Sequence, residues 1–421
     1  MMLLAPRAFL HSLFDAAVAA AQPGPAVAAN LPQRPKGRTI VIGAGKASAQ
    51  MARAFEQAWD GPIEGLVVTR YGYACPCERI EIVEAAHPVP DASGLAAAAR
   101  LKKLVSGLTA DDLVVALISG GGSALLPAPA GGLTLADEIA LNEALLASGA
   151  PIGAMNAVRK QISTIKGGRL AALAAPARVV SLVISDVPGD DPAAVASGPT
   201  VPDETTRQEA RDIVARYRMA LPPAVGALIA GDANLPPHPS DGVFARNEVK
   251  VIASAARSLE AAAEVAAQHG VAAAILSDAI EGEARDVGQV HAALAREVAL
   301  RDRPFKKPVV MISGGETTVT LRGKGKGGRN TEFLLSLALN IQGQAGIHAI
   351  AGDTDGIDGS EDNAGGFVDA TTADRLRAAG RDPQAMLADN DAWSAFSAIG
   401  DLLVTGPTGT NVNDFRAVLI V

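Results

Sequence analysis

An alternation that runs almost from end to end is the feature that most constrains how this chain folds. Short apolar runs rich in β-branched residues are each followed by a longer stretch of Ala, Leu and Glu with helical periodicity. Strands that alternate with helices favour α/β layers around mostly parallel sheets. The chain has 421 residues, which exceeds the length that one hydrophobic core usually supports, so we expect two domains.

A proline-rich stretch, Leu221–Gly242, predicts where the two domains meet, because clustered prolines interrupt both helices and strands. We therefore assign residues 1–225 to the first domain, 226–242 to a linker or hinge, and 243–402 to the second domain. The C-terminal strand, within residues 403–421, is a candidate to cross back and complete the first domain.

The charge balance narrows the choice of ligand. A net charge of -8 argues against nonspecific binding to nucleic acid or to an anionic membrane. The cations are instead concentrated in a few loops, which suits a small anionic ligand. No uninterrupted apolar run approaches the length of a membrane span.

The N-terminal residues and the cysteines favour a cytoplasmic protein. Polar residues interrupt the apolar run near the start, so an amphipathic helix with an apolar stripe from Leu10 to Val18 is preferred to a signal peptide. Cys75 and Cys77 are separated by one proline, which is a poor geometry for a disulfide, so we expect two free thiols in a reducing compartment.

The segment Gly323–Asn330 concentrates charge and backbone freedom. It places Lys324, Lys326 and Arg329 among four glycines and then enters a helix-like stretch. Glycines let the backbone turn its N–H groups toward an anion, and a helix N-terminus adds a favourable dipole. The pattern predicts a loop that binds phosphate or another multivalent anion.

Two further glycine turns follow apolar strands. In the first, Lys46 comes just before a helix, where a cation suits a bound anion, although a solvated lysine is an equally good interpretation of this turn alone. Ser48 stands where a dinucleotide-binding fingerprint has its third glycine, and the next strand ends at Arg70 and not at an acid. The second turn, Ser119–Ser123, offers a backbone nest for phosphate oxygens, the alternative being a tight turn without a ligand.

A predicted helix carries small polar and basic residues on one side. At helical spacing this side has no acidic partner within the segment, which favours an anion site over an ordinary solvated face. Its residues are Asn156, Arg159, Lys160, Ser163 and Lys166.

Two acidic segments are candidates for catalysis and metal binding. Asp186 follows a strand, where α/β proteins place catalytic groups. Asp190 is either a metal ligand or a turn residue. The loop that contains Asp353, Asp355 and Asp358 fits magnesium, which prefers a few carboxylates with water and phosphate oxygens; a plain acidic surface loop is the alternative.

Taken together, these segments resemble the glycerate 2-kinase family, whose C-terminal part is called the MOFRL domain. The resemblance spans nearly the whole chain, in order. It rests on Gly43–Lys46, Ser119–Ser123, Val158–Leu170, Ser185–Asp190, Ser197–Thr200, Ser313–Val319, Gly328–Glu332, Gly352–Gly356 and Gly406–Asp414.

The resemblance implies two α/β domains, each a three-layer α/β/α sandwich, the first Rossmann-like with a mostly parallel sheet. It implies transfer of a phosphoryl group from ATP, with Mg²⁺, to the 2-hydroxyl of D-glycerate in a cleft between the domains. Lys46 and Arg329 match the basic residues that the family places there. As partners we expect only this small molecule, with no nucleic acid and no membrane, in a monomer or homodimer.

Each candidate residue then receives an expected role. Lys46, Arg329 and Asp186 are the expected catalytic residues, with Asp186 orienting or deprotonating the 2-hydroxyl. The expected substrate-binding residues are Lys46, Arg329, Asn330 and Ser119. The expected phosphate-binding residues are Gly120, Gly121, Gly122, Ser123, Arg159, Lys166, Lys324 and Lys326. The expected metal ligands are Asp353, Asp355 and Asp190.

Two other functions remain open at this point. An NAD(P)H-dependent hydroxypyruvate reductase would use the first glycine turn, but the third glycine and a His beside an acid are missing, and only His87 lies in a suitable loop. A non-catalytic sensor of nucleotides or sugar acids would need the binding loops without the acidic pair.

Overall fold

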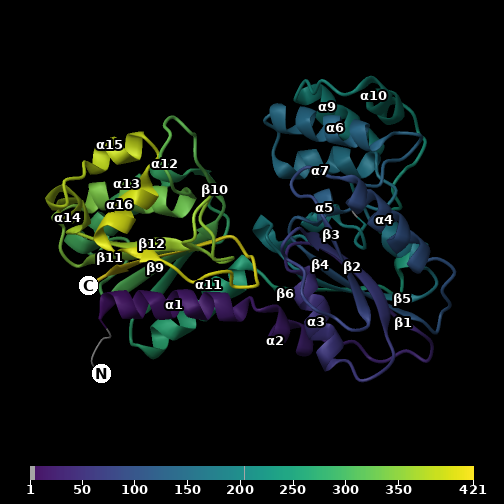
Figure 1. Ribbon diagram of the computed structural model, residues 1–421, viewed down its shortest axis with the longest axis horizontal. Helices are drawn as coiled ribbons and strands as arrows, with labels where there is room; N and C mark the ends of the chain where they lie inside the picture. The colour runs from purple at the N-terminus through teal and green to yellow at the C-terminus, as the bar shows by residue number, and fades with distance from the viewer. Residues whose placement is uncertain (1–4, 203) are drawn as a thin grey trace. The chain divides into compact units, whose positions relative to one another are not determined.

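The computed structural model describes residues 5–202 and 204–421, which form two compact units. One unit is Pro23–Ile252, and the other joins residues 5–22 to Ala253–Val421. Figure 1 labels the elements of both and colours them along the chain. The first described residues and the last therefore belong to the same unit.

A six-stranded sheet forms the centre of the unit Pro23–Ile252. Its order is β3-β2-β1-β4-β5-β6, and the pairs β1–β2, β2–β3, β1–β4 and β4–β5 are parallel. This is the strand order of the doubly wound dinucleotide-binding fold, so the Rossmann-like prediction is confirmed. The strands are β1 (Thr39–Ala44), β2 (Glu64–Arg70), β3 (Ile80–Ala85), β4 (Leu113–Ser119), β5 (Arg178–Ile184) and β6 (Glu248–Ala253).

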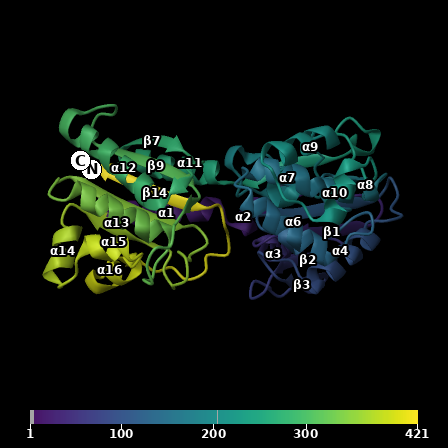
Figure 2. The ribbon, with the colours of Figure 1, turned by 90° about the horizontal axis from the view of Figure 1, so that it is seen from above.

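Helices pack on this sheet and also form a small core of their own. This core is formed where α6, α7, α9 and α10 come together (Figure 2), and it contains Leu141, Leu145, Val158, Val225 and Ile229. The helices are α2 (Pro23–Ala28), α3 (Ser48–Ala58), α4 (Ala92–Leu104), α5 (Gly122–Leu125), α6 (Leu135–Ala147), α7 (Ile152–Gln161), α8 (Arg169–Ala174), α9 (Arg207–Arg216) and α10 (Pro223–Ala230).

A second six-stranded sheet lies in the other unit. Its order is β13-β12-β11-β14-β9-β7, in which β7 and β9 are parallel and the other pairs are antiparallel. The strands are β7 (Ala272–Ser277), β9 (Val309–Gly315), β11 (Ile347–Asp353), β12 (Gly365–Asp369), β13 (Leu402–Leu403) and β14 (Asp414–Ile420). A separate pair joins β8 (Gly282–Glu283) to β10 (Thr317–Thr318).

Each face of the second sheet has its own apolar core, which makes three layers. Phe9 and Leu259 belong to the core under α1 and α11, whereas Phe333 and Ala295 belong to the core under α12 and α13. Figure 1 shows α1 and α11 on one side of the sheet and α12, α13 and α16 on the other. The helices are α1 (Pro6–Ala20), α11 (Ala255–Gln268), α12 (Ala284–Arg301), α13 (Arg329–Ile341), α14 (Thr372–Ala378), α15 (Pro383–Ala388) and α16 (Ala392–Ile399).

The proline-rich stretch is not the boundary between the units. Val225 and Ile229, on α10, are buried in the helical core of the first unit, and Arg207 donates hydrogen bonds to the carbonyls of Leu228 and Ala233. The chain then forms β6, the sixth strand of the first sheet, and leaves the unit only after Ile252. The prolines therefore mark turns within a packed region, and the boundary predicted at residues 226–242 is wrong.

The two ends of the chain are also placed differently from the expectation. The stripe of α1, expected in the first domain, packs on α11 and the second sheet, where Phe14 meets Phe415 edge to face with ring centroids 5.9 Å apart. The C-terminal strand β14 pairs with β9 and β11 in the centre of the second sheet. It therefore completes the second unit and not the first, because the strands that pair with it lie in residues 309–353.

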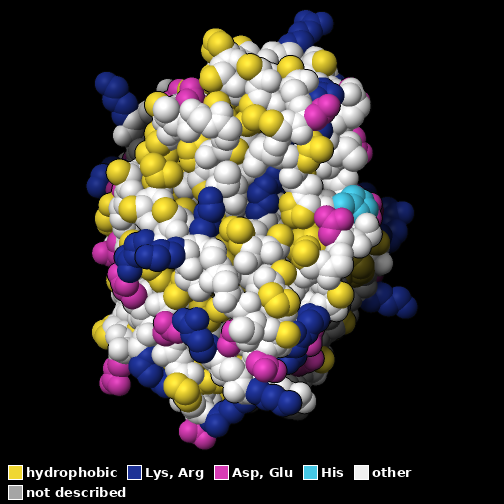
Figure 3. All heavy atoms as spheres, turned by 90° about the vertical axis from the view of Figure 1, so that its right-hand side faces the viewer, with side chains coloured by type: hydrophobic (Ala, Val, Ile, Leu, Met, Phe, Trp, Pro, Cys, Tyr) yellow, Lys and Arg dark blue, Asp and Glu magenta, His cyan; other side chains and the backbone are white. Residues whose placement is uncertain are grey.

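Among the described residues, none of the helices combines the length and the apolar character that crossing a membrane requires. On the described part of the face in Figure 3, basic side chains are scattered and interleaved with acidic ones. That face therefore presents no continuous basic stripe.

Candidate active site

Two glycine turns meet at the carboxyl ends of β1 and β4. The N–H of Lys46 donates to the carbonyl of Gly120 at 2.8 Å, and the N–H of Ala47 donates to Oγ of Ser119 at 3.0 Å. Oγ of Ser48 lies 3.0 Å from the same hydroxyl. Ser119 is only 1% exposed, so it joins the two turns inside the protein, and its predicted contact with substrate is corrected to this structural role.

Gly120 and Gly121 are glycines because functional side chains occupy the space beside them. A Cβ on Gly120 would lie 1.8 Å from Oδ2 of Asp186. A Cβ on Gly121, whose φ is +79°, would lie 3.0 Å from Nε2 of His87 and 3.2 Å from Cγ of Lys46. No real Cβ tolerates the first of these distances, so the glycines let three side chains from different strand ends approach one turn.

The turn also leaves backbone N–H groups available to donate hydrogen bonds to a ligand. Among the described residues, the N–H groups of Gly121, Gly122 and Ser123 have no hydrogen-bond acceptor. Three successive N–H groups of this kind form an anion-binding concavity. The structure is thus consistent with the phosphate nest predicted at Gly120–Ser123, with Lys46 beside it.

A chain of hydrogen bonds extends from the nest to α7. Oγ of Ser123 lies 2.9 Å from Oγ of Ser197, which donates to Oδ1 of Asn156 at 3.1 Å. Arg159 donates to the same Oδ1 at 3.1 Å and to Asn142 at 2.8 Å, and burial lowers the pKa of its guanidinium. Ser197 was not among the expected site residues, because the partners of its side chain lie 41 and 74 residues away in sequence.

Lys166 is not a phosphate-binding residue. Its Nζ forms a buried ion pair with Oε1 of Glu138 at 2.7 Å and donates to the carbonyl of Leu126 at 3.0 Å. The side chains of Lys166 and Glu138 are 2% and 5% exposed. The helix predicted to carry Lys166 has no acid nearby in sequence, but α7 ends at Gln161 and Lys166 lies in the turn beyond it, where α6 supplies Glu138. This prediction is therefore wrong.

Arg329, in the other unit, is held by three carboxylates. Its Nε donates to Asp414 at 2.7 Å, Nη1 to Glu316 at 3.1 Å and Nη2 to Asp353 at 2.6 Å. Burial by itself would lower the pKa of Arg329, but the charges of these carboxylates raise it above its ordinary value. The carboxyl of Asp353 has a raised pKa because burial outweighs the charge of Arg329.

The first turn of α13 is already capped by a carboxylate. Asp358 accepts hydrogen bonds from the N–H groups of Asn330 and Thr331, at 2.9 and 2.8 Å, and from Oγ1 of Thr331 at 2.8 Å. Burial raises the pKa of Asp358 to about 6. Asn330 is fully buried and donates to Asp414 at 2.8 Å, so its predicted contact with substrate is also corrected to an internal one.

The glycine-lysine loop is likewise filled by acids of the same chain. The N–H of Lys324 donates to Asp389 at 3.2 Å, and that of Lys326 donates to Asp391 at 3.0 Å. Nζ of Lys326 lies 3.4 Å from Glu361 and 5.3 Å from the ring centroid of Trp393. The backbone therefore does not form the open cradle that the sequence predicted, although the two lysine side chains remain exposed.

The predicted metal ligands are divided between the two units. Asp353 uses one carboxylate oxygen on Arg329 and the other on the N–H of Asp355, whereas Asp190 belongs to the other unit. In the described part of the chain, no three His, Cys, Asp or Glu side chains are arranged to hold a metal. Asp355 binds the N–H of Ile357 through one oxygen only, so it fits the magnesium mode in which a single carboxylate is joined by phosphates and water.

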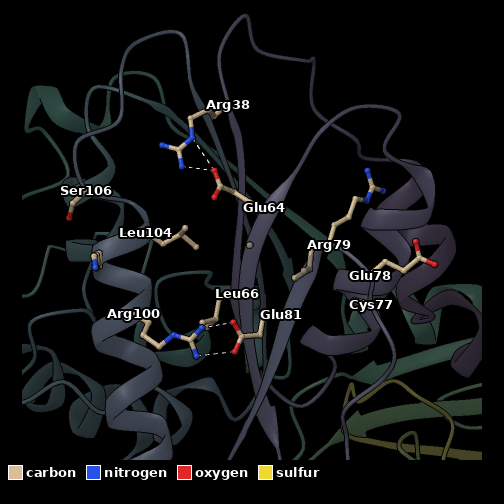
Figure 4. Close-up of a pocket in the computed structure, with 13 residues that line it drawn as sticks. Arg38, Glu64, Leu66, Cys77, Glu78, Arg79, Glu81, Arg100, Leu104 and Ser106 are labelled. Atoms are coloured by element: carbon tan, nitrogen blue, oxygen red, sulfur yellow. Dashed lines mark hydrogen bonds and ion pairs between the residues drawn. The ribbon is translucent and has the colours of Figure 1, made fainter.

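A cavity of about 700 Å³ lies at the opposite, amino ends of the strands in the first sheet. Figure 4 shows it between the starts of β2 and β3 and the end of α4, where Arg38 pairs with Glu64 and Arg100 with Glu81. Cys77 lines it as a free thiol whose pKa burial raises to about 12. Because its arginines are already paired and the nest is at the other strand ends, this cavity is not the candidate active site.

The fold and the nest define an α/β protein with a candidate anion site at the carboxyl ends of its parallel strands. Comparison with known proteins gives the family. The sequence matches the family described as "Domain of unknown function (DUF4147)" over residues 9–230 and the MOFRL family over residues 309–414. A protein of Agrobacterium vitis named "Putative hydroxypyruvate reductase" is 55% identical over 98% of this chain and 94% of its own length.

The D-glycerate 2-kinase of Thermotoga maritima is 41% identical over 95% of this chain and 94% of its own length. The crystal structure of glycerate kinase from the same organism matches with a TM-score of 0.90 and 40% identity, covering 99% of each chain. The chain belongs to the glycerate kinase family, and the resemblance noted in its motifs is confirmed.

Proposed function

We propose that this protein is an ATP-dependent glycerate 2-kinase that converts D-glycerate and ATP to 2-phospho-D-glycerate and ADP. The observation that carries the proposal is the Gly121–Ser123 nest, with unused N–H groups beside Lys46 and Asp186. Sequence and structural similarity to proteins named glycerate kinase indicates glycerate as the substrate.

The proposed roles follow the positions of the side chains. Lys46 binds the carboxylate of glycerate, and the nest with Ser123 and Arg159 binds phosphate oxygens. The 2-hydroxyl oxygen forms a bond to the γ-phosphorus as the bond from that phosphorus to the oxygen of ADP breaks. The hydroxyl proton passes to the carboxylate of Asp186. Positioning and charge, with little covalent chemistry, account for the rate enhancement of phosphoryl transfer.

The role expected for Arg329 is revised because of the acidic residues around it. Because Arg329 already binds three carboxylates, we propose that it organises Asp353, Asp414 and Glu316 and does not act as a free anion receptor. Asp355 is the residue that we propose would hold magnesium, an ion that neutralises charge on transferring phosphates. Lys324 and Lys326 would contribute charge through their exposed side chains.

A reductase function has little support in the site. Ser48, in the third glycine position of the dinucleotide fingerprint, is fully buried and bonded to Ser119. Arg70, at the end of β2, stacks on Tyr73, with the guanidinium carbon 3.7 Å from the ring centroid. Burial, with the charges of Lys46 and Arg70, lowers the pKa of His87 to about 4, so at neutral pH His87 is not the imidazolium that would donate a proton to a carbonyl under reduction.

The decisive experiment measures both reactions with purified protein. Phosphorus NMR of a mixture with ATP, Mg²⁺ and D-glycerate should show ADP and 2-phosphoglycerate in equal amounts. NAD(P)H absorbance with hydroxypyruvate should stay constant in a separate assay. Consumption of NAD(P)H without formation of ADP would overturn the kinase proposal, and 3-phosphoglycerate as the product would overturn the choice of hydroxyl.

We also propose that the enzyme acts in the cytoplasm as a monomer or homodimer. The free thiols Cys75 and Cys77 support a reducing compartment. Light scattering coupled to gel filtration tests the oligomeric state, and a trimer or larger species would contradict it.

A further inference from the structure

His87 is a side chain at this site that the proposed roles do not use. It follows β3. A Cβ built on Gly121 would lie 3.0 Å from Nε2 of His87 and 3.2 Å from Cγ of Lys46, so both side chains lie beside this glycine. The imidazole is only partly exposed. Among the described residues it has no hydrogen-bond partner, although both of its nitrogens can form one.

The surroundings of His87 keep the imidazole neutral. Burial is the largest cause of its lowered pKa, and the positive charges of Lys46 and Arg70 act in the same direction. A neutral imidazole offers one N–H donor and one lone pair. Such a group is suited to an uncharged hydroxyl, whereas a carboxylate is better matched by the neighbouring lysine.

The polar groups of glycerate can be matched to the side chains beside the two glycines. Glycerate has a carboxylate, a reacting 2-hydroxyl and a 3-hydroxyl that must remain unmodified. Three side chains flank Gly120 and Gly121: a cation, Lys46; a carboxylate, Asp186; and a neutral imidazole, His87. With Lys46 on the carboxylate and Asp186 on the reacting hydroxyl, the 3-hydroxyl is left for the imidazole.

We propose that His87 is a substrate-contacting residue that hydrogen-bonds the 3-hydroxyl of glycerate and thereby selects which hydroxyl faces the nucleotide. This inference rests on the proposed glycerate kinase function. It assigns His87 a role in substrate selection, not in proton transfer.

The test compares two ligands that differ only at this hydroxyl. D-Lactate is D-glycerate without the 3-hydroxyl, so the ratio of their dissociation constants isolates the contact. Titration calorimetry of the full chain with each ligand gives this ratio for the wild type, His87→Ala and His87→Gln. A hydrogen bond to a neutral group contributes about 1 kcal/mol, so we expect the wild type to prefer D-glycerate about 5-fold.

In His87→Ala the preference should fall to nearly 1, and His87→Gln, which keeps a donor and an acceptor, should retain part of it. His238→Ala is the matched control, because His238 is an exposed histidine of the same unit, and it should keep the wild-type ratio. An unchanged ratio in both His87 variants overturns the inference. So does an equal loss of affinity for both ligands, since that would place His87 on a group that they share.

Failure of the inference can be told apart from failure of the proposed function. If the wild type phosphorylates D-glycerate but the variants keep the preference, the inference alone is overturned. If the wild type neither binds nor phosphorylates D-glycerate, the proposed function itself is overturned. Should His87→Ala fail to fold, as its circular dichroism would reveal, the ratio in His87→Gln decides.

Discussion

At the scale of single residues, the partner of a charged side chain decides its role. Lys46, Lys166 and Arg329 are all cations close to glycines in the sequence. Lys46 borders a nest with unused donors, Lys166 is buried against Glu138, and Arg329 is surrounded by carboxylates. Cationic side chains therefore lie in three different settings in this protein, namely beside a candidate anion nest, in a buried ion pair and within a cluster of carboxylates.

Lys46→Ala should abolish most activity while leaving the fold intact. The structural hydrogen bond at this position uses the backbone N–H, which alanine keeps. Loss of a preorganised charge costs about 100-fold or more in turnover. Steady-state kinetics and thermal unfolding measure the two effects, with exposed Lys36→Ala as the control. Near-normal turnover would remove Lys46 from the mechanism.

Arg329→Ala should reduce both activity and stability. Removing one partner of a buried ion pair leaves uncompensated charge and costs about 3 kcal/mol or more. Arg329→Lys keeps the charge but not the fork that reaches three carboxylates, so it should fall between Arg329→Ala and the wild type in both measurements. Urea unfolding alongside turnover provides the comparison, and a fully stable but inactive Arg329→Ala would point to direct binding of substrate instead.

Lys166→Met and Lys324→Met should separate a buried lysine from an exposed one. Lys166→Met leaves the carboxylate of Glu138 buried without its partner, so we expect a loss of about 3 kcal/mol in unfolding free energy. Lys324→Met should leave stability unchanged and raise KM for ATP by a few fold. If the stability of Lys166→Met equals that of the wild type, the ion pair contributes nothing.

At the scale of elements, α13 begins on a buried carboxylate and not on a bound anion. Asp358 accepts the N–H groups that the first turn leaves unsatisfied. The four glycines before α13 therefore serve close packing: a Cβ on Gly328 would lie 2.3 Å from Oδ1 of Asp358, and one on Gly325 would lie 2.4 Å from Cβ of Asp391.

The raised pKa of Asp358 predicts a pH dependence of stability. Burial raises it from 3.8 to about 6 in the folded protein, so between these values the folded state holds a proton that the unfolded state has released. Stability that this group contributes is complete below about pH 4 and is lost as the pH rises through about 6.

Urea unfolding between pH 4 and 7 measures this effect by comparing the wild type with Asp358→Asn. The wild type should lose stability relative to the variant as the pH rises across that window. A difference that is constant with pH would mean that Asp358 titrates normally in the folded protein.

At the scale of the whole molecule, the first and the last described residues lie in the same unit. Residues 5–22 pack on the unit formed by Ala253–Val421, although 230 residues of the other unit, Pro23–Ile252, lie between them in sequence. Strand β14 then occupies the centre of the second sheet. Residues near both ends of the described chain, such as Phe9 and Phe415, therefore belong to one core.

Phe14→Ala should destabilise the second unit selectively. Phe14 is 1% exposed and packs against Phe415, and truncation of a buried Phe costs about 3–5 kcal/mol. Hydrogen exchange read by mass spectrometry should show faster exchange in α11, β11 and β14 and unchanged exchange in β1 and β4. Equal acceleration in both sheets would mean that the two units unfold together.

Local sequence patterns were sufficient to predict the structure wherever neighbours in sequence are also neighbours in space. The α/β alternation, the strand-turn-helix units at Lys46 and Ser119 and the amphipathic stripe of α1 all follow from periodicity and turn chemistry. The pairing of Lys166 with Glu138, the carboxylates around Arg329 and the central position of β14 did not. All but one of their partners lie 24 to 111 residues away, the exception being Glu316, which is 13 residues from Arg329.

The sequence by itself determined the fold class, the family and the glycine nest beside Lys46, since these depend on periodicity and on residue types at short spacing. Only the tertiary structure decided which charged groups remain available to a ligand. The reason is that buried charges and helix ends must be neutralised or capped, and the acids that do so at Lys166, Arg329 and α13 come from distant elements.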